Sequence, residues 1–414
     1  MRTAAALLSL LVLTSMLATA APVEPAGGAT ALDAGAEEAG AAPVVTVRNS
    51  TNYLTPPESI SRSTVTTASL NVGAAVAVSS DDLATRFGTI AFLERFERAD
   101  TDEDRAAVVR QTIVALENRS ATLLAQQRLA VDRYRRGTSS ARTLVREFAE
   151  IGAAASQVEE LKATIRDQVD STVGFNPQQS LLNRLTNVSA GTEPLRSPIR
   201  TRLADYLDRP TGLPVSVGVA GDSFVLAIVE AGTYQREAFI GEFYAANGTN
   251  QFENQSDEPV SVAFDRVLQL YPWADDHLVS NPGLSSYGPA PLYRVTLPTE
   301  HGDVVTSISA VSGEVYREYQ RKPLDRLPTA PVATNETAAL ELTLNGTHDT
   351  GPARVEVSTA TVGTPVDARI TVDGTYVGST GEDGHLWIAE PAGLFQVNAT
   401  TADGDRITLG TYGA

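Results

Sequence analysis

The sequence predicts a multidomain α+β protein with an N-terminal antiparallel helical bundle, a central α+β domain and a C-terminal all-β sandwich. Apolar residues between 101 and 170 recur at alternating steps of three and four, which is the repeat of packed helices. From Pro214 onward apolar and polar residues alternate as in strands, and after residue 336 the alternating segments are separated by Asp-Gly turns. The predicted parts are a signal peptide at 1–21, a disordered tether at 22–43, the helical bundle with short N-terminal strands at 44–207, the α+β domain at 208–322, a linker at 323–335 and the β-sandwich at 336–414.

The charge balance restricts the partners and the environment. Fifty acidic residues face 32 basic ones, the net charge is −18, and lysine occurs only at Lys162 and Lys322. Such an acidic, lysine-poor composition is typical of proteins in saturated salt, where screening suppresses the repulsion between carboxylates; a GC-rich genome that favours arginine codons is the alternative. Without a basic stripe, nucleic acid is excluded as a partner. The chain has no cysteine, which excludes disulfides, thiolate metal sites and a cysteine nucleophile.

The first residues have the pattern of an export signal. Arg2 precedes an apolar run from Ala4 to Leu17, and Ala18-Thr19-Ala20 forms a cleavage site of small residues. An uncleaved anchor helix is the alternative. We therefore expect an extracellular or cell-surface protein without a membrane span once the signal is removed. The following segment, 22–43, is too poor in large apolar residues to fold and is expected to be a tether.

A long coiled-coil-like hairpin dominates the predicted bundle. Thr101 begins its first helix, Gly137 ends it, and Ser139 or Ser140 caps the second. The predicted seam consists of Val109, Ile113, Leu116, Leu123, Ala130 and Tyr134 on the first helix, with Ser120 and Gln127 in between, and of Leu144, Phe148, Ile151, Ala155, Val158, Ile165 and Val169 on the second, interrupted at Lys162. Before the hairpin, Ser80 is expected to cap a helix that buries Leu83, Phe87, Ile90, Leu93 and Phe96. Two weaker helices are expected at 178–185 and 198–207.

The central domain is predicted to be a meander with one helix. Strands are expected at 215–220, 223–230 and 234–246, a helix carries Ala263 to Leu270, and further strands follow at 292–297, 303–310 and 314–320. The run Ser309-Ala-Val-Ser-Gly-Glu-Val315 resembles the terminal hairpin of PepSY-like secreted α/β domains, with Ser309 in place of the usual acid. This resemblance implies that the domain binds or restrains another secreted protein, often a peptidase.

A proline-rich linker at 323–335 is expected to precede the β-sandwich. Asp373-Gly374, Asp383-Gly384 and Asp403-Gly404 mark its turns. Residues 367–384 resemble the carboxypeptidase-regulatory or transthyretin-like β-sandwich, which implies a structural or adhesive role. The whole chain, through Arg48-Asn-Ser-Thr-Asn-Tyr-Leu54 and Ala91-Phe-Leu-Glu-Arg-Phe96, is similar to secreted proteins of halophilic archaea, a family that brings no activity with it.

Asn-x-Ser/Thr sequons without proline are the most frequent motif of the chain. Together with the export signal they predict N-glycosylation at several sites. Coincidence in a threonine-rich chain is the alternative. The candidate acceptors are Asn49, Asn118, Asn187, Asn247, Asn254, Asn335, Asn345 and Asn398.

Three motifs resemble catalytic or metal-binding sites, and each has a simpler structural interpretation. Gly221-Asp222-Ser223 resembles the start of a Gly-Asp-Ser hydrolase, but no histidine follows an aspartate at the required spacing, so a turn between strands is favoured. Asp275-Asp276-His277 has potential cation ligands but is typical of a solvated helix end. The acidic turns containing Glu382, Asp383, Asp403 and Asp405 spell out no calcium loop. We therefore predict no catalytic residue, no metal and no cofactor.

The sequence thus predicts a non-enzymatic secreted or cell-envelope glycoprotein of a halophilic archaeon that acts as a structural or protein-interaction module. Its expected partners are other extracellular or envelope proteins, and the oligomeric state is left open. A secreted hydrolase centred on Ser223 or on the Asp275–His277 cluster is one alternative. A module that restrains a secreted peptidase through residues 215–320 is the other.

Overall fold

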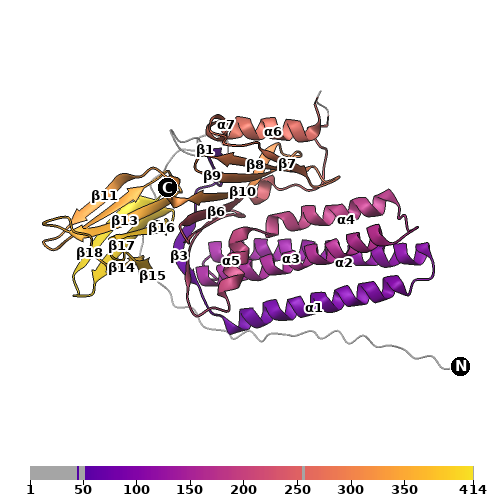
Figure 1. The fold of residues 1–414 in the computed structure, drawn as a ribbon, viewed down its shortest axis with the longest axis horizontal. Helices are drawn as coiled ribbons and strands as arrows, with labels where there is room; N and C mark the ends of the chain where they lie inside the picture. Colours follow the sequence, from indigo (N-terminus) through magenta and orange to yellow (C-terminus); the bar gives the residue numbers. More distant parts are fainter. Residues whose placement is uncertain (1–43, 46–51, 254–256, 414) are drawn as a thin grey trace. The chain divides into compact units, whose positions relative to one another are not determined.

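The computed structural model describes residues 44–45, 52–253 and 257–413 (Figure 1). The predicted signal peptide, the tether and the sequons at Asn49 and Asn254 lie outside these residues. The described part is a multidomain α+β protein, in which a helical region precedes a series of antiparallel sheets. Among its helices, none combines the length and the apolar character needed to span a bilayer.

Five helices form the N-terminal region, and most begin with a side-chain cap. Thr101, Ser140 and Ser197 accept backbone N–H groups of the first turns, as Asn71 does for the first helix. Three acidic residues in the first turn of the second helix stabilise it, because the helix dipole makes its N-terminal end positive. The helices are α1 (Val72–Glu97), α2 (Asp102–Arg135), α3 (Ala141–Ser171), α4 (Gln179–Thr192) and α5 (Pro198–Tyr206).

Helices α2 and α3 pack against each other along the predicted stripe. Every apolar residue predicted on that stripe is buried, and so are the polar Ser120 and Gln127. The Ser120 hydroxyl donates a hydrogen bond to the carbonyl of Leu116, and the side-chain amide oxygen of Gln127 accepts a hydrogen bond from Arg200. Both polar side chains therefore lie inside the helical layer with their oxygen atoms in hydrogen bonds, whereas the Gln127 Nε2 amide has no hydrogen-bond partner there.

The prediction for α1 was wrong in its start and, apart from Phe96, in its fully buried residues. The helix begins at Val72, because the Asn71 side chain accepts the N–H of Ala74, whereas Ser80 lies in its middle. Its buried residues are Ala74, Phe92 and Phe96, while Leu83, Phe87 and Ile90 are exposed. The helix has apolar residues on two sides, so the periodicity alone could not indicate which side faces the core.

An eight-stranded antiparallel sheet forms the centre of the fold. Its first strand, β3, precedes the helices in sequence yet pairs with β4 over its whole length. The sheet has the order β3-β4-β5-β6-β10-β9-β8-β7, made of β3 (Arg62–Ala68), β4 (Leu213–Ala220), β5 (Ser223–Glu230), β6 (Thr233–Phe239), β10 (Glu314–Pro323), β9 (Gly302–Ser309), β8 (Leu292–Thr299) and β7 (Gly283–Ser286). The third strand of the meander was predicted too long, because the chain leaves the sheet at Ile240 for a short 3₁₀ turn.

Helices cover both faces of this sheet (Figure 1). Phe148 of α3 packs with Val217 and Phe224 in one core, together with residues of α2 and α5. On the opposite face, α6 (Pro259–Leu270) and α7 (Pro272–Asp276) cover Val295 and Val304 in a second core. Alternation along each strand supplies apolar residues to both cores. The strands β1 (Val44–Val45) and β2 (Tyr53–Leu54) form a short antiparallel pair. Beside β2, the side-chain oxygen of Asn52 accepts the backbone N–H of Trp273 and so connects this pair to α7.

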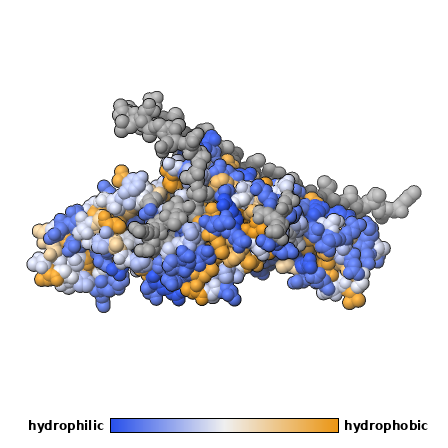
Figure 2. Space-filling model, turned by 90° about the horizontal axis from the view of Figure 1, so that it is seen from above, coloured by the Kyte–Doolittle hydropathy of each residue, from blue (hydrophilic) through white to orange (hydrophobic). Residues whose placement is uncertain are grey.

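Two four-stranded sheets form the predicted C-terminal β-sandwich. Their strands are β11 (Ala330–Glu336), β12 (Leu340–Gly346), β13 (Pro352–Thr359) and β16 (His385–Ala389) in one sheet, and β15 (Thr375–Ser379), β14 (Ala368–Val372), β17 (Gly393–Thr401) and β18 (Arg406–Gly413) in the other. The predicted linker was wrong in its second half, which is β11, an edge strand that tolerates proline. The polar C-terminus likewise forms the edge strand β18. On the face drawn in Figure 2, hydrophilic residues predominate and hydrophobic ones form small separate patches.

Candidate functional site

A surface cavity of about 370 Å³ lies between the α4–α5 corner and strands β8 to β10. The corner is sharp because Pro194 lies in a 3₁₀ turn (Glu193–Leu195) and Pro198 opens α5 behind the Ser197 cap. The residues that line the cavity are mostly polar or charged: Ser156, Ser189, Glu193, Arg196, Ser197, Pro198, Thr201, Tyr287, Arg294, Val305, Ser307, Arg317 and Tyr319. We call it the arginine-rimmed cavity.

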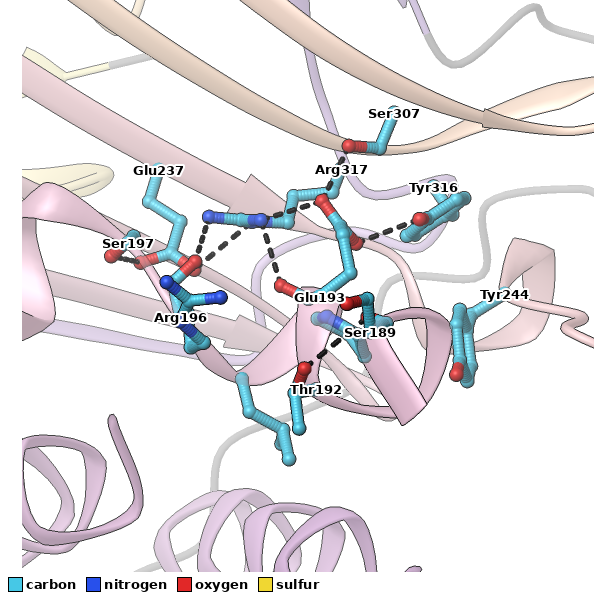
Figure 3. Close-up of polar contacts among 12 residues, drawn as sticks. Ser189, Thr192, Glu193, Arg196, Ser197, Glu237, Tyr244, Ser307, Tyr316 and Arg317 are labelled. Atoms are coloured by element: carbon cyan, nitrogen blue, oxygen red, sulfur yellow. Dashed lines mark hydrogen bonds and ion pairs between the residues drawn. The ribbon is translucent and has the colours of Figure 1, made fainter. Parts of the chain in front are cut away.

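Glu193 is the central acid of this site (Figure 3). Its carboxylate accepts hydrogen bonds from Arg317 Nη1 at 2.6 Å, from the Tyr316 hydroxyl at 2.7 Å and from the Ser307 hydroxyl. Tyr316 and Arg317 are neighbours on β10 and would ordinarily point to opposite faces of the sheet. A bulge between Val315 and Arg317 bends the strand here, so both side chains reach Glu193.

A second buried acid, Glu237 on β6, continues the network. It is fully buried, accepts from the Ser197 hydroxyl, and forms ion pairs with Arg200 at 3.2 Å and with Arg317 at 3.6 Å. Burial by itself would raise the pKa of Glu237, but the charges of Arg200 and Arg317 together lower it below its usual value. Glu193, Arg317, Glu237 and Arg200 therefore alternate in charge from the cavity into the protein.

This chain of charges joins the helical layer to the sheet. The guanidinium of Arg200 donates to Gln127 Oε1 of α2 at 2.7 Å and to the carbonyl of Leu195 at 3.0 Å. Although burial opposes it, the carboxylates of Glu193 and Glu237 raise the pKa of Arg317 above its usual value. Burial and the Glu193 charge likewise raise the pKa of Tyr316, which keeps its proton for donation. The network thus pairs two carboxyl groups with two guanidinium groups, so its formal charges balance.

The outer part of the cavity is cationic. Arg294 is exposed, and the Arg196 side chain is 43% exposed with its guanidinium 3.9 Å from Glu159. Among the described residues that line the cavity, Arg196, Arg294 and Arg317 are basic and only Glu193 is acidic. Because the Glu193 carboxylate is engaged by three donors, the groups open to a ligand are guanidinium and hydroxyl groups. Such groups bind carboxylates or other oxyanions through charge-assisted hydrogen bonds.

The hydrolase-like residues of the sequence are not brought together. Ser223 is 3% exposed on β5, behind the β4–β5 turn. The His277 ring stacks on Trp273 with centroids 4.1 Å apart, and its Nδ1 lies 2.7 Å from the Trp273 carbonyl oxygen. Trp273 also stacks on His301. These contacts explain His277 as a packing residue at the end of α7.

The acidic motifs also lie apart from the cavity. Asp275 and Asp276 are exposed at the end of α7, and Asp383 is exposed in the turn before β16, where it pairs with His385. In the part of the chain that the structure describes, no three His, Asp or Glu side chains are grouped so that they could hold a metal ion.

The described sequon asparagines differ widely in exposure. Asn118, Asn247 and Asn335 are exposed, and Asn187 and Asn398 are partly buried. Asn345 is only 5% exposed on β12. The Asn335 amide nitrogen donates to the carbonyl of Thr408 at 2.7 Å. Because oligosaccharide transfer needs an accessible side-chain amide, Asn118 and Asn247 are the strongest acceptor candidates and Asn345 is the weakest.

Sequence reasoning missed the whole buried network, although one signal was present. The dipeptide Arg-Glu occurs in two of the predicted strands, at Arg236-Glu237 and Arg317-Glu318. These strands are neighbours, so alternation places Glu237 and Arg317 on the face toward α5. Arg236 and Glu318 lie on the other face, where Arg236 Nη1 is 2.8 Å from Glu318 Oε1. There Glu318 also accepts the N–H of Leu54 and thereby holds β2.

Comparison with known families divides the chain into three matched regions. Residues 1–210, half of the chain, match a domain of unknown function (DUF7096). The chain belongs to the DUF7096 family. Residues 215–328 match a family of unknown function (DUF7094), and residues 331–408 match an archaeal fibronectin-III type-like domain. No curated protein and no solved structure matches the chain.

These matches refine the expectations for the C-terminal part. The β-sandwich is shown, and its match is to a fibronectin-III type-like domain rather than to the transthyretin-like family that residues 367–384 resemble. The buried network connects the first two matched regions, because Glu193 and Arg200 belong to the DUF7096 region and Glu237 and Arg317 to the DUF7094 region. The arginine-rimmed cavity therefore lies where these two regions meet.

Proposed function

We propose that this member of the DUF7096 family is a non-enzymatic, extracellular or cell-envelope glycoprotein of a halophilic archaeon. In this proposal it binds another envelope protein, and the arginine-rimmed cavity receives an acidic group of that partner. The export signal, the sequons, the acidic composition and the fibronectin-III type-like domain support the location and the class. The coiled-coil-like α2–α3 hairpin acts as a rigid support, and the α6 and β8–β10 region acts as a PepSY-like binding module.

One observation supports the role of the cavity above the others. Its acid is turned inward and neutralised, whereas Arg196 and Arg294 face outward in a protein of net charge −18. A carboxylate that enters can form planar, bidentate hydrogen bonds with guanidinium groups. Such bonds depend on direct contact, so they persist in concentrated salt, where long-range attraction is screened.

A peptidase is one kind of partner that this arrangement favours. The strands that line the cavity, β8 to β10, are the same strands whose hairpin resembles PepSY-like domains. A module of this kind would restrain the peptidase by binding an acidic loop or a chain terminus in the cavity. The identity of the partner separates this role from a purely structural one.

The test compares three full-length proteins, expressed with a C-terminal tag in a halophilic archaeal host. They are the wild type, Arg196→Gln/Arg294→Gln, and the charge-matched control Arg110→Gln/Arg142→Gln, whose arginines are exposed on the helices away from the cavity. Each is cross-linked in the intact envelope, purified in high salt and analysed by mass spectrometry of cross-linked peptides and glycopeptides.

We expect one stoichiometric partner, with cross-links to residues around the cavity, in the wild type and the control. The cavity variant should lose at least tenfold of that partner while keeping its fold and its glycopeptides. Equal recovery of the partner by all three proteins would refute the role of the cavity. Protein found inside the cell and without glycans would refute the proposed class.

A further inference from the structure

Helix α1 has an exposed apolar side along most of its length. The exposed fractions are 68% for Val72, 58% for Val76, 54% for Leu83, 63% for Phe87 and 52% for Ile90. In Figure 1 the helix lies at the outer edge of the helical layer, with α2 and α3 on its inner side. Single exposed apolar residues are ordinary, but a continuous row of this kind marks an interaction surface.

This side of α1 is also nearly free of charge. From Val72 to Ala91 the exposed residues are Val72, Gly73, Val76, Ala77, Ser79, Ser80, Leu83, Ala84, Arg86, Phe87, Ile90 and Ala91, of which Arg86 is charged. The side chains of Asp81 and Asp82 are 48% and 41% exposed, and both are held in ion pairs, with Arg119 and with Arg86. A fifth of the whole chain is charged. Solvent-exposed helices of an acidic protein usually carry carboxylates on their outer side. This side of α1 is therefore better suited to contact with another protein than with solvent.

The spacing of the row fits a second helix. Val76, Ser80, Leu83, Phe87 and Ile90 follow one another at steps of four, three, four and three, which is the repeat of a coiled-coil seam. Beside the seam, small residues recur every seven positions at Ala77, Ala84 and Ala91, and they permit two helix backbones to approach closely. The surface is therefore shaped for a helix of similar length.

We propose that this partner is α1 of a second copy of the chain, packed antiparallel across a two-fold axis near Leu83. A shallow hollow of about 360 Å³ lies over the N-terminal half of the row and is lined by Leu70, Val72, Ala75, Val76, Ser79, Ser80, Leu83 and Asp208. The C-terminal half presents the bulky Phe87 and Ile90 instead. An axis at Leu83 places Phe87 of each copy opposite the serines of the other and Ile90 opposite Val76. The bulky C-terminal half of the row on each copy then packs into the hollow over the N-terminal half on the other copy, as a self-complementary interface requires.

The area approaches that of a stable dimer. The six large apolar residues from Leu70 to Ile90 expose roughly 600 Å² on each copy, so complete coverage of these side chains buries at most about 1,200 Å², the lower end of standard specific interfaces. The interface is apolar at its centre and polar at its ends, and this distribution is typical of lasting association.

The absence of cysteine makes a direct test possible. Leu83→Cys in the full-length chain lies on the predicted axis and should form an intermolecular disulfide under mild oxidation in high salt. Val76→Cys alone should not, but an equal mixture of Val76→Cys and Ile90→Cys proteins should cross-link to each other. Val114→Cys, on the exposed side of α2, is the matched control. Cross-linking of Val76→Cys to itself would overturn the antiparallel arrangement.

The second measurement is the mass in solution by multi-angle light scattering. We expect a dimer for the wild type and for the control Val114→Glu/Leu129→Glu, and a folded monomer for Leu83→Glu/Phe87→Glu, with at least a hundredfold weaker self-association. A monomeric wild type overturns the proposal. A second outcome would also overturn it: a monomer whose Leu83→Cys thiol reacts only after residues 22–43 are deleted. In that case the N-terminal segment, and not a second copy, would cover the apolar side of α1. Binding of the monomer to lipid vesicles through α1 would also overturn it.

Discussion

The buried Lys322 should make the stability of the protein rise with pH between 7 and 9.5. Its side chain is 1% exposed on β10, and its Nζ lies 2.6 Å from His348 Nε2. Burial lowers the pKa of Lys322 from 10.5 to about 7, against the opposing charge of Glu318. Between pH 7 and 10.5 the unfolded chain therefore binds a proton that the folded chain has released, so the free energy of unfolding increases with pH.

The magnitude follows from the size of the shift. Each pH unit in this window is worth about 1.4 kcal/mol, so the full change of about 3.5 units corresponds to roughly 5 kcal/mol. The neighbouring imidazoles of His348 and His301 are neutral here, since burial lowers the pKa of both. Several buried tyrosines, whose pKa values are raised, reverse the trend above about pH 9.5. The usable gain is about 3 kcal/mol between pH 7 and 9.5.

Two assays measure this effect. Urea unfolding in constant high salt should give the rise for the wild type and for Lys162→Met, whose lysine pairs with Glu159 in the helical layer, and a flat profile for Lys322→Met. Because the chain has only two lysines, ¹⁵N-labelled lysine should give two resolved side-chain signals, one of which titrates near pH 7. A signal of Lys322 that titrates above pH 9, or an equal rise in Lys322→Met, would refute the reasoning.

Three further predictions address the network, the backbone and the sequons. Glu237→Gln should destabilise the protein by about 3–5 kcal/mol in urea unfolding, because it leaves buried guanidinium groups uncompensated; a loss below 1 kcal/mol would show that the ion pairs add little. Gly302→Ala should lower the thermal midpoint clearly, since φ is +124° and a Cβ would come within 2.1 Å of the Arg321 carbonyl oxygen. Gly410→Ala, with open space around it, should change that midpoint by no more than one or two degrees. Glycopeptide mapping should find Asn247 modified and Asn345 unmodified, and a glycan on Asn345 would contradict its burial.

Much of the secondary structure could be predicted because its causes are local. The α2–α3 stripe follows from the spacing of apolar residues, and Thr101 and Ser140 cap the helices as polar side chains do in isolation. The hairpins of the meander and of the β-sandwich likewise follow from alternation and from Asp-Gly turns. The errors occurred where more than one local interpretation existed. In α1 two apolar sides competed, and at β11 prolines that suggested a linker are accommodated on a sheet edge.

The sequence by itself thus determined the class of the fold, the long helices, the β-sandwich and the acidic character of the chain, because periodicity and composition act over a few residues. Only the tertiary structure decided how β3 joins a sheet begun after the helices, and how Glu193, Glu237 and Arg317 meet at one cavity. Those contacts join residues far apart in sequence. They depend on strand order, on the bulge at Val315 and on the sharp α4–α5 corner, and the free energy of burying these charges becomes favourable only when all of them are in place.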